Sequence, residues 1–385
     1  MRSSTPLKIM YVYYHLAYTG GVVRVLSDKM NYLSLNGFNV SLITYEQGEH
    51  PIIFPLNTNI KHFDTQTPVF PLYKYNIWTR IYKQFKINRV FRNRLQNIVD
   101  QIHPNIIITI AGDQMSCHAV TKLNTKAKRI IESHSINFET MNGIKRKHKN
   151  ILHKIYDIYS KRTISKFDAL VALTHGSANE WKKIIPTVFV IPNPITKYPE
   201  EISRPSNYKR MIAVGRLDIE KGFDRLITAF NLISEKISDW KLDIYGDGKE
   251  KDKLLSQITS ASLNNQIEIH QPTSDIYNEY LRSDFCVVSS YYEGWGLVIV
   301  EAMSCGIPCV SFNCKYGPQD IIKDHENGLL ALNNDIRDLS DKMLWMCTHQ
   351  EERIKMGIKA REDMKSFKKE DIMSKWVQLF YNIYE

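Results

Sequence analysis

Residues 287–312 constrain the fold of this chain most, because a short apolar run there leads through the loop YYEGWG into a helical pattern. The helical pattern stops at Gly306 and Pro308, and a second apolar run follows. This order predicts strand, loop, helix and strand, which is the repeating unit of a parallel sheet. Gly294 and Gly296 stand at the corner between loop and helix, where glycine lets backbone N–H groups approach a ligand closely. Because a helix N-terminus is electropositive, the corner predicts a binding site for an anion, most simply a phosphate.

Two glutamates accompany this corner. Glu293 lies just before the glycines, and Glu301 lies about two turns into the predicted helix. A phosphate would repel a carboxylate, so we expect both side chains to accept hydrogen bonds from hydroxyl groups instead. Phosphate and hydroxyls together suggest a nucleotide sugar. The alternative is that Glu293 caps the helix and Glu301 lies on its solvent face.

The length of the chain, 385 residues, predicts two domains rather than one core. With 24% charged residues and no apolar run of membrane-spanning length, the composition is that of a soluble globular protein. The N-terminus, MRSSTPLKIMYVYYHL, lacks a small-residue cleavage site and is interpreted as a first strand rather than a signal peptide. We therefore expect a cytoplasmic protein.

Charge is divided unevenly along the chain. Residues 1–196 carry 26 Lys and Arg against 11 Asp and Glu, a net charge of +15, whereas the remainder carries 25 against 30, a net charge of −5. The N-terminal half is therefore expected to meet the negative charge of a partner.

The first half of the chain begins as a βαβ unit. Residues 8–14 and 39–45 are predicted strands, and a helical pattern covers 22–35 between them. Gly20 and Gly21 occupy the first turn, without forming the G-x-G-x-x-G fingerprint of dinucleotide-binding proteins. A plain tight turn would also explain these glycines. Their loop nevertheless lies outside the carboxyl end of a strand, where ligands bind in open parallel sheets.

A basic helix is predicted at residues 76–102, where lysines and arginines alternate with aromatic residues at a spacing of three to four. A second basic segment covers 145–149 and continues through Lys154, Lys161, Arg162 and Lys166. A solvated helix face is the simplest interpretation. Anionic lipid headgroups are the next, and nucleic acid ranks behind them because no zinc-finger or RNA-recognition signature accompanies the charge.

His134 follows the predicted strand 128–132 directly, in the sequence IIESHS. A histidine just past the carboxyl end of a strand points toward the ligand side of an α/β sheet, although a single histidine can also be purely structural. Predicted strands at 105–110, 167–173 and 188–191 complete this sheet.

The proline-rich polar segment 197–209 predicts the boundary between the domains. A second sheet starts at 210–214, and GRLDIEKGFDRLITAF repeats the order of strand, glycine turn and helix. Arg216 and Lys221 flank that turn, where two cations could hold a diphosphate. Ordinary surface charge is the alternative. Further strands are predicted at 241–245, 266–270 and 284–289, which gives two α/β halves that face each other.

Three of the six cysteines, Cys305, Cys309 and Cys314, form the pattern C-x3-C-x4-C. Cys305 falls at a helix end and Cys309 in the next strand, and no His-x3–5-His follows. Packing of helix on sheet by small residues explains these cysteines better than metal binding.

The C-terminal half resembles the retaining glycosyltransferases of family four (glycosyl transferases group 1), which have the GT-B fold of two Rossmann-like parallel-sheet domains facing across a cleft. The resemblance rests on GRL followed by EKG at 215–222, on Gly246-Asp247-Gly248, and on the E-x7-E pattern around G-x-G-L at 293–301. It is close over most of 210–330 and looser in the N-terminal half. It implies an N-terminal, acceptor-side domain at 1–196 completed by a C-terminal helix at 371–385, a linker at 197–209 and a donor domain at 210–370. That helix would present Trp376, Phe380 and Tyr384 on one face.

The resemblance also implies roles for individual residues. Arg216 and Lys221 would bind the donor diphosphate, Glu301 the ribose hydroxyls, and Glu293 the hydroxyls of the transferred sugar. Backbone amides of the corner would hold phosphate and sugar, the Gly-Gly turn would close over the phosphates, and His134 would face the reacting carbon. The implied catalytic residues are His134, Glu293, Arg216 and Lys221. The implied donor-binding residues are Gly20, Gly21, Arg216, Lys221, Glu293, Gly294, Gly296, Leu297 and Glu301.

These expectations define a retaining glycosyltransferase that needs no cofactor and no metal, since a convincing D-x-D motif is absent from the sequence and the two cations can meet the charge of the leaving group. The stretch 316–322, YGPQDII, resembles relatives that transfer hexoses and acetamidohexoses in surface polysaccharide assembly, and it favours a UDP-sugar donor. The acceptor would be a glycan or a polyprenyl-diphosphate-linked glycan, reached on the inner face of the cytoplasmic membrane by the basic domain. The alternatives are another GT-B enzyme of UDP-sugars, such as an epimerase, and a catalytically silent nucleotide-sugar binder or basic scaffold.

Overall fold

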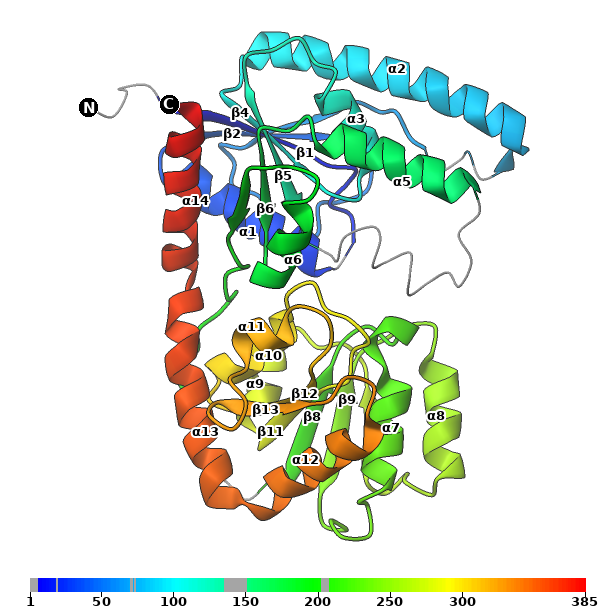
Figure 1. Cartoon of the computed structure of the whole chain (residues 1–385), viewed down its shortest axis with the longest axis vertical. Helices are drawn as coiled ribbons and strands as arrows, with labels where there is room; N and C mark the ends of the chain where they lie inside the picture. The colour runs from blue at the N-terminus through cyan, green and yellow to red at the C-terminus, as the bar shows by residue number, and fades with distance from the viewer. Residues whose placement is uncertain (1–5, 19, 70–71, 73, 135–150, 202–207) are drawn as a thin grey trace. The chain divides into compact units, whose positions relative to one another are not determined.

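The computed structural model describes residues 6–18, 20–69, 72, 74–134, 151–201 and 208–385. The chain forms two compact units, one made of Met1–Ile191 and Met373–Glu385 and the other of Pro192–Ile372 (Figure 1). Each unit is built on one parallel sheet. The basic segment predicted at 145–149 and residues 202–207 of the predicted linker lie outside the described residues.

The sheet of the first unit has seven parallel strands in the order β3-β2-β1-β4-β5-β6-β7. They are β1 (Lys8–Val12), β2 (Asn39–Thr44), β3 (Lys61–Asp64), β4 (Ile106–Ile110), β5 (Lys128–Ser133), β6 (Ala169–Ala172) and β7 (Val188–Val190). All five residues of β4, IIITI, are buried, as expected for a central parallel strand that is covered on both faces. Sequence reasoning missed β3, because the edge strand KHFD is polar and half-exposed.

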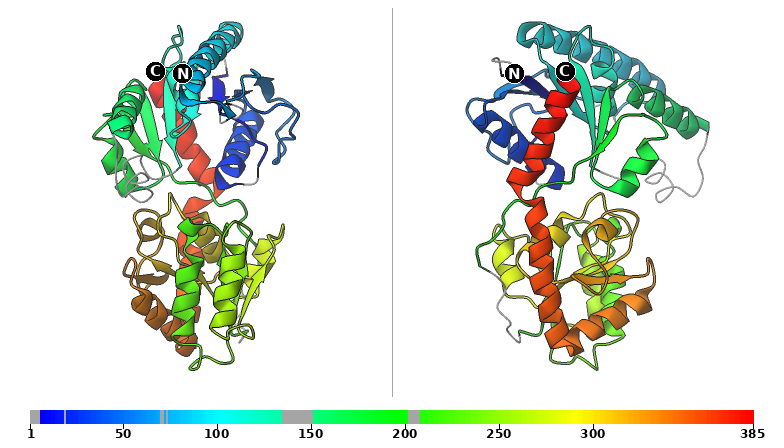
Figure 2. Two further views of the ribbon diagram at one scale, coloured as in Figure 1. Left: turned by 90° about the vertical axis from the view of Figure 1, so that its right-hand side faces the viewer. Right: turned by 60° about the vertical axis from the view of Figure 1, so that its left-hand side comes forward.

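Helices cover both faces of this sheet (Figures 1 and 2). One face, which carries Met10, Ile107 and Ile131, packs against α2 (Ile77–Ile102), α3 (Gln114–Val120), α5 (Ile151–Ile164) and α6 (His175–Trp181). The opposite face packs against α1 (Gly21–Leu35) and the C-terminal half of α14 (Lys369–Tyr384).

The predicted basic helix is α2, and its two halves differ. The side chain of Asn76 caps its N-terminus by accepting a hydrogen bond from the Thr79 backbone N–H at 3.0 Å. Phe91, Leu95 and Val99 are buried in the second half, at the four-residue spacing of one helix face. The first half instead exposes its large apolar side chains, namely Trp78, Ile81, Tyr82 and Phe85.

The sheet of the second unit has six parallel strands in the order β10-β9-β8-β11-β12-β13. They are β8 (Arg210–Val214), β9 (Lys241–Tyr245), β10 (Ile267–His270), β11 (Phe285–Val288), β12 (Cys309–Phe312) and β13 (Gly328–Ala331). Its helices are η2 (Ile219–Lys221), α7 (Phe223–Asn231), α8 (Lys251–Ser260), α9 (Ile276–Leu281), α10 (Leu297–Ser304), α11 (Pro318–Ile321), α12 (Ile336–Thr348), α13 (Gln350–Asp363) and η3 (Met364–Phe367). Residues of α7, α8 and α12 share one apolar core with the sheet.

The C-terminal helix confirms part of its predicted contact face. Trp376 and Phe380 are buried, and the ring of Phe380 lies 6.3 Å from that of Phe38 in the first unit. The prediction for Tyr384 is wrong, since its side chain is 43% exposed in the last turn. Tyr381 contacts Phe38 instead, at a ring distance of 6.2 Å.

The cysteines pack as small apolar residues. Cys305 ends α10 and Cys309 opens β12, as predicted, and both are buried and unpaired. The Cys309 Sγ donates to the Ile299 carbonyl at 3.8 Å, which ties helix to strand. Among the described residues, no helix is both long and apolar enough to cross a membrane.

Candidate active site

Strand order places a ligand site in each unit. In the first sheet β1 and β4 are neighbours, and in the second sheet β8 and β11 are neighbours. From each of these pairs, the strands that follow along the chain are added toward opposite edges of the sheet. Ligands in such sheets bind outside the carboxyl ends of the strands at this switch point. In the second unit the loops after β8 and β11 meet there, since the backbone N–H of Tyr291 donates to the Glu220 carbonyl at 2.9 Å.

Lys221 and Glu293 form the centre of this switch point. The Lys221 Nζ lies 2.7 Å from Oε1 of Glu293, and the Ser290 hydroxyl donates to the same oxygen at 2.6 Å. The two charged side chains are 23% and 12% exposed, so they remain accessible to a ligand while screening by water is reduced. The structure thus brings together a cation and a carboxylate that lie 72 residues apart in the chain.

The N-terminus of α10 completes this arrangement. Its cap is Gly296, with a φ of +101°, and no side chain caps it. The suggestion that Glu293 caps the helix is therefore wrong, because its carboxylate faces Lys221 and Ser290 instead. The N–H groups of Ile299 and Val300 donate to the Gly296 carbonyl, so an anion site here can use only the N–H groups of Leu297 and Val298.

Arg216 lies at the same switch point, but its guanidinium is paired with carboxylates of its own turn. Its guanidinium pairs with Asp218 at 2.9 Å and Glu220 at 2.6 Å, and its side chain is 63% exposed. Exposed pairs of this kind contribute little free energy, so Arg216 can leave them for a diphosphate at small cost.

Glu301 is buried, with 8% of its surface exposed, so its predicted alternative on a solvent face is wrong. Burial, together with the nearby Glu301 charge, raises the pKa of Tyr280. The Glu301 carboxylate therefore lies on the face of α10 that packs against the rest of the unit, and not in bulk water.

Sequence reasoning missed Arg225, a buried residue of α7. Its guanidinium donates to the Ser289 carbonyl and to the Asn334 side chain, and lies 3.6 Å from the centre of the Tyr291 ring. Arg225 thereby fixes the loop that carries Glu293. The signal was an arginine within the otherwise apolar face of FDRLITAF.

In the first unit, Gly20 and Gly21 lie at the start of α1, with Gly20 as its cap. The φ of Gly20 is −170°, which is extended backbone open to any residue. A Cβ at this position would instead lie 2.7 Å from the Tyr18 ring, so the close approach of that ring is what favours glycine.

His134 lines a cavity of about 670 Å³ in the first unit. Its Nε2 lies 2.9 Å from Oε2 of Glu132, and the His134 side chain is 3% exposed. The cavity is also lined by Asp113 and by several tyrosines, namely Tyr13, Tyr14, Tyr45, Tyr156 and Tyr159. Sequence reasoning missed these tyrosines, which come from separate loops and helices.

Asp113 supplies a second polar group to this cavity. It caps α3 by accepting hydrogen bonds from the Ser116 backbone N–H and hydroxyl, and it also accepts one from the Tyr45 hydroxyl at 2.9 Å. Burial raises the pKa of Asp113 and outweighs these hydrogen bonds, which lower it. A mostly apolar cavity with a few fixed polar groups is typical of a small-molecule site.

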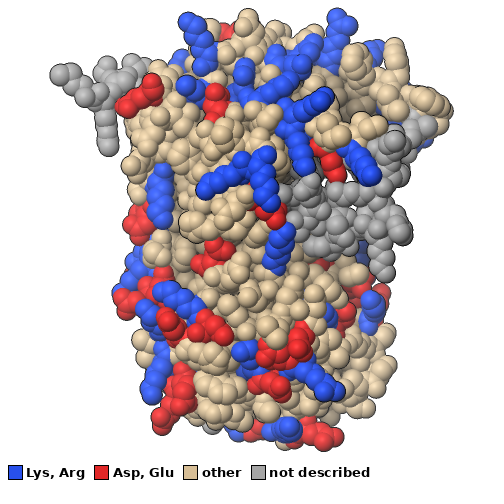
Figure 3. Space-filling model, in the orientation of Figure 1, with Lys and Arg blue, Asp and Glu red and all other residues tan. Residues whose placement is uncertain are grey.

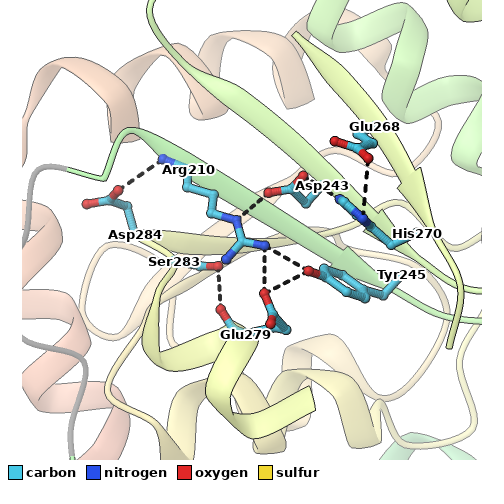
Figure 4. Close-up of polar contacts among 8 residues, drawn as sticks. All are labelled: Arg210, Asp243, Tyr245, Glu268, His270, Glu279, Ser283 and Asp284. Atoms are coloured by element: carbon cyan, nitrogen blue, oxygen red, sulfur yellow. Dashed lines mark hydrogen bonds and ion pairs between the residues drawn. The ribbon is translucent and has the colours of Figure 1, made fainter. Parts of the chain in front are cut away.

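One group among the described residues has the chemistry of metal ligands, namely Asp243, Glu268 and His270. Figure 4 shows that these side chains lie on the β9 and β10 face beside Arg210. The Asp243 carboxylate already accepts from the Arg210 guanidinium and lies 2.7 Å from Nε2 of His270. A divalent cation there would be repelled by the guanidinium, so the cluster is better described as a network that anchors α9.

This network makes a prediction about stability. Arg210→Met should lower the free energy of unfolding by about 1–3 kcal/mol at pH 7, because the carboxylates of Asp243 and Glu279 lose a shared donor. Burial raises the pKa of Glu279, but Tyr245 and Arg210 lower it more, so the folded pKa lies below the unfolded one. The stability from Glu279 is then present above its unfolded pKa and is lost as pH falls through the folded pKa.

Urea unfolding at pH 7 and near pH 3.5 measures this effect, and the difference between wild type and variant should shrink at the lower pH. The control is Lys209→Met, whose ion pair with Asp239 is exposed and should contribute under about 0.5 kcal/mol. Equal losses in the two variants would contradict the assignment.

Comparisons with known proteins identify the family and the fold. The family described as "Glycosyl transferases group 1" matches residues 194–363, and "Glycosyltransferase Family 4" matches residues 19–197. An uncharacterized glycosyltransferase of Haemophilus influenzae is 26% identical over 372 residues, which are 96% of this chain and 98% of that protein. The amylovoran biosynthesis glycosyltransferase AmsD of Erwinia amylovora is 26% identical over 329 residues, or 82% and 84% of the two chains.

A solved structure extends the likeness to the fold. A mutant of S. aureus TarM, in complex with Fondaparinux, alpha-GlcNAc-glycerol and UDP, superposes with a TM-score of 0.75 at 18% identity. The match covers 97% of this chain and 99% of that one. Each half of the sequence matches a glycosyltransferase family model and the whole chain matches one solved fold, and so the chain belongs to the family-four (group 1) glycosyltransferases and is a glycosyltransferase of the GT-B fold.

Proposed function

We propose that this glycosyltransferase moves a hexose or acetamidohexose from a UDP-sugar to a growing surface glycan, with retention of anomeric configuration and without a metal. The observation that carries the proposal is the contact between Lys221 and Glu293 at the switch point of the second sheet, next to the uncapped N-terminus of α10. Cation and helix N-terminus suit a diphosphate, and the carboxylate suits sugar hydroxyls.

The chemical step assigns each group a task. The bond from the anomeric carbon to the diphosphate oxygen breaks, and its electron pair leaves with UDP. Lys221, Arg216 and the N–H groups of α10 stabilise that developing charge. The acceptor oxygen forms the new bond on the same face of the sugar, and its proton passes to the departing phosphate oxygen. Glu293 holds the donor sugar through its hydroxyls, and His134 accepts a hydrogen bond from a sugar hydroxyl.

The donor and the pathway are supported by relatives. TarM was solved with UDP and alpha-GlcNAc-glycerol, and AmsD is named for amylovoran biosynthesis. A UDP-sugar donor and a polysaccharide product are therefore the first to be tested for this chain.

The acceptor is proposed to bind in the tyrosine-lined cavity that holds His134. A second hollow of about 690 Å³ along α2 is lined by Tyr75, Ile81 and Phe85, and it shares Arg80, Gln84 and Asn88 with that cavity. Because the two hollows share these residues, we propose that together they form one path from His134 to the exposed apolar side chains of α2. Such a path suits an acceptor that carries both a sugar and a lipid, joined through phosphate.

The first half of α2 is proposed to dock on an anionic membrane surface. Trp78, Tyr82 and Phe85 are 80%, 69% and 72% exposed. Lysines and arginines surround these rings, and Figure 3 shows basic side chains concentrated over α2 and α5. Aromatic rings flanked by cations are the combination that favours the interface of an anionic bilayer.

This docking predicts the behaviour of a surface variant. Trp78→Ser/Phe85→Ser should lose at least about tenfold in binding to vesicles of phosphatidylglycerol and phosphatidylcholine, because two inserted rings are removed. Leu35→Ser is the matched control, since Leu35 is 70% exposed on α1 and should leave binding unchanged. Sedimentation with vesicles measures both. Equal binding by all three proteins, or stronger salt-dependent binding to RNA than to vesicles, would contradict the membrane assignment.

The donor and metal assignments are tested by hydrolysis of UDP-, GDP- and ADP-sugars with and without EDTA. We expect slow cleavage of one UDP-sugar that EDTA leaves unchanged and Glu293→Ala abolishes. The released sugar should first appear in the anomeric configuration of the donor. Cleavage that stops in EDTA would reject metal independence, and cleavage of a GDP-sugar alone would reject the donor.

A further inference from the structure

Lys29 of α1 is a lysine buried in the core of the first unit. It is 1% exposed, and its Nζ lies 2.6 Å from both carboxylate oxygens of Glu132 on β5. Burying an ion pair costs desolvation free energy, and apolar side chains of similar volume often stabilise a core at least as well. Stability alone therefore does not account for this pair, and Glu132 has a second contact.

That contact is His134. Residues alternate along β5, so Ile130 and Glu132 point to the face of the sheet that packs against α1, and His134 follows Ser133, the last residue of the strand. Oε2 of Glu132 lies 2.9 Å from Nε2 of His134. Burial raises the pKa of Glu132, but the Lys29 charge and the hydrogen bond from His134 lower it more, so the carboxylate stays ionised. An ionised carboxylate can only accept, and it therefore takes the Nε2–H of the imidazole.

The other ring nitrogen of His134 is Nδ1. Nδ1 is buried and has no hydrogen-bond partner among the described residues, while the side chain lines the 670 Å³ cavity. In a neutral imidazole with its proton on Nε2, Nδ1 is an acceptor. A sugar offers hydroxyl groups as hydrogen-bond donors to such an acceptor.

Trp376 of α14 closes the other side of Lys29. The Lys29 Nζ lies 3.4 Å from the centre of the indole ring and 5.9 Å from that of Tyr11. An aromatic face stabilises an ammonium group without offering it a second carboxylate. Trp376 of the C-terminal helix thus covers the Lys29 ammonium group on the side away from Glu132 and leaves Glu132 as its carboxylate partner.

We propose that Lys29, Glu132 and Trp376 are positioning residues that hold His134 in a single tautomer, with Nδ1 presented to a hydroxyl of the sugar substrate. The identity of that hydroxyl rests on the proposed function, whereas the tautomer does not. His134 contacts substrate, and the other three act through it.

The tautomer is tested by long-range proton–nitrogen NMR spectra of protein labelled with ¹⁵N-histidine, assigned with His134→Asn. At a pH where the ring of His134 is neutral, wild type should show the ring proton on Nε2 alone. Glu132→Gln, which keeps the volume of the side chain, should show a mixture of both forms because the amide can accept from or donate to the ring. A proton on Nδ1 in wild type, or an unchanged spectrum in Glu132→Gln, would overturn the proposal.

A kinetic experiment separates positioning from a structural role. Lys29→Met/Glu132→Leu removes both charges, so it should remain folded while hydrolysing UDP-sugar about 10–100-fold more slowly, as loss of a supporting hydrogen bond does elsewhere. The matched control is Arg353→Met/Asp284→Leu, which removes a buried ion pair of the second unit and should hydrolyse within about twofold of wild type. A folded Lys29→Met/Glu132→Leu protein with wild-type hydrolysis would reject positioning. If wild type cleaves no donor, the proposed function fails, and the NMR spectra still decide the tautomer.

Discussion

Lys221→Met is expected to slow hydrolysis of the UDP-sugar about 10²–10³-fold, the loss typical when one preorganised charge-stabilising group is removed from an active site. Lys221 lies 2.7 Å from Glu293 in a site where both side chains are mostly shielded from water. Its charge acts on the diphosphate as negative charge develops there, so most of the loss should be in kcat. Steady-state hydrolysis gives both kcat and KM.

Two comparisons make this result specific. Lys253→Met removes an exposed lysine of α8, 66% exposed and paired with Glu250, and should leave hydrolysis unchanged. Glu293→Gln keeps the shape of the side chain but removes the charge that Lys221 meets, and it should also reduce hydrolysis. If the Lys221→Met enzyme hydrolysed UDP-sugar within about twofold of the wild-type rate, this lysine would not stabilise the leaving group.

Gly222→Ala should reduce hydrolysis about 10²-fold, because it displaces the segment that carries Lys221. Gly222 has a φ of +62°, and an added Cβ would lie 2.3 Å from the Ser289 carbonyl oxygen. That carbonyl belongs to the loop after β11, which also carries Glu293. The Ser289 hydroxyl donates to the Lys221 carbonyl at 2.9 Å, so the two loops would separate at the point where the site is assembled.

Gly37→Ala controls for backbone strain. Gly37 has a φ of +85° with nothing within 4 Å of the added Cβ, so this variant carries the left-handed strain of about 1 kcal/mol without a collision. It should unfold at slightly lower urea concentration and hydrolyse donor at the wild-type rate. If Gly222→Ala and Gly37→Ala lost equal activity, backbone strain rather than the spacing of the two loops would be responsible.

The sequence predicted the parallel sheets because buried strands such as IIITI and CVSF are continuous apolar runs between glycine turns. It also predicted the placement of Lys221, Glu293 and Gly296, since the carboxyl ends of β8 and β11 meet wherever those strands are neighbours. These features follow from local pattern and from the rules of strand connection.

Other features depend on contacts between distant residues that no local pattern contains. Lys29 resembles an ordinary surface lysine of a helix until α1 is packed on β5, 103 residues away, and covered by Trp376. Arg216 illustrates the reverse case, because its position was predicted but its carboxylate partners on the same turn were not. The tyrosine-lined cavity likewise exists only once separate segments of the first unit come together.

Calorimetric titration of UDP into the wild-type protein and the Lys221→Met variant, both in EDTA, tests the central claim most directly. The claim is that the switch point of the second sheet binds a nucleoside diphosphate through Lys221 and the N-terminus of α10. We expect wild type to bind one UDP per chain without metal, and the variant to bind at least about tenfold more weakly. No binding by wild type in EDTA, or equal affinities in the two proteins, would contradict that claim.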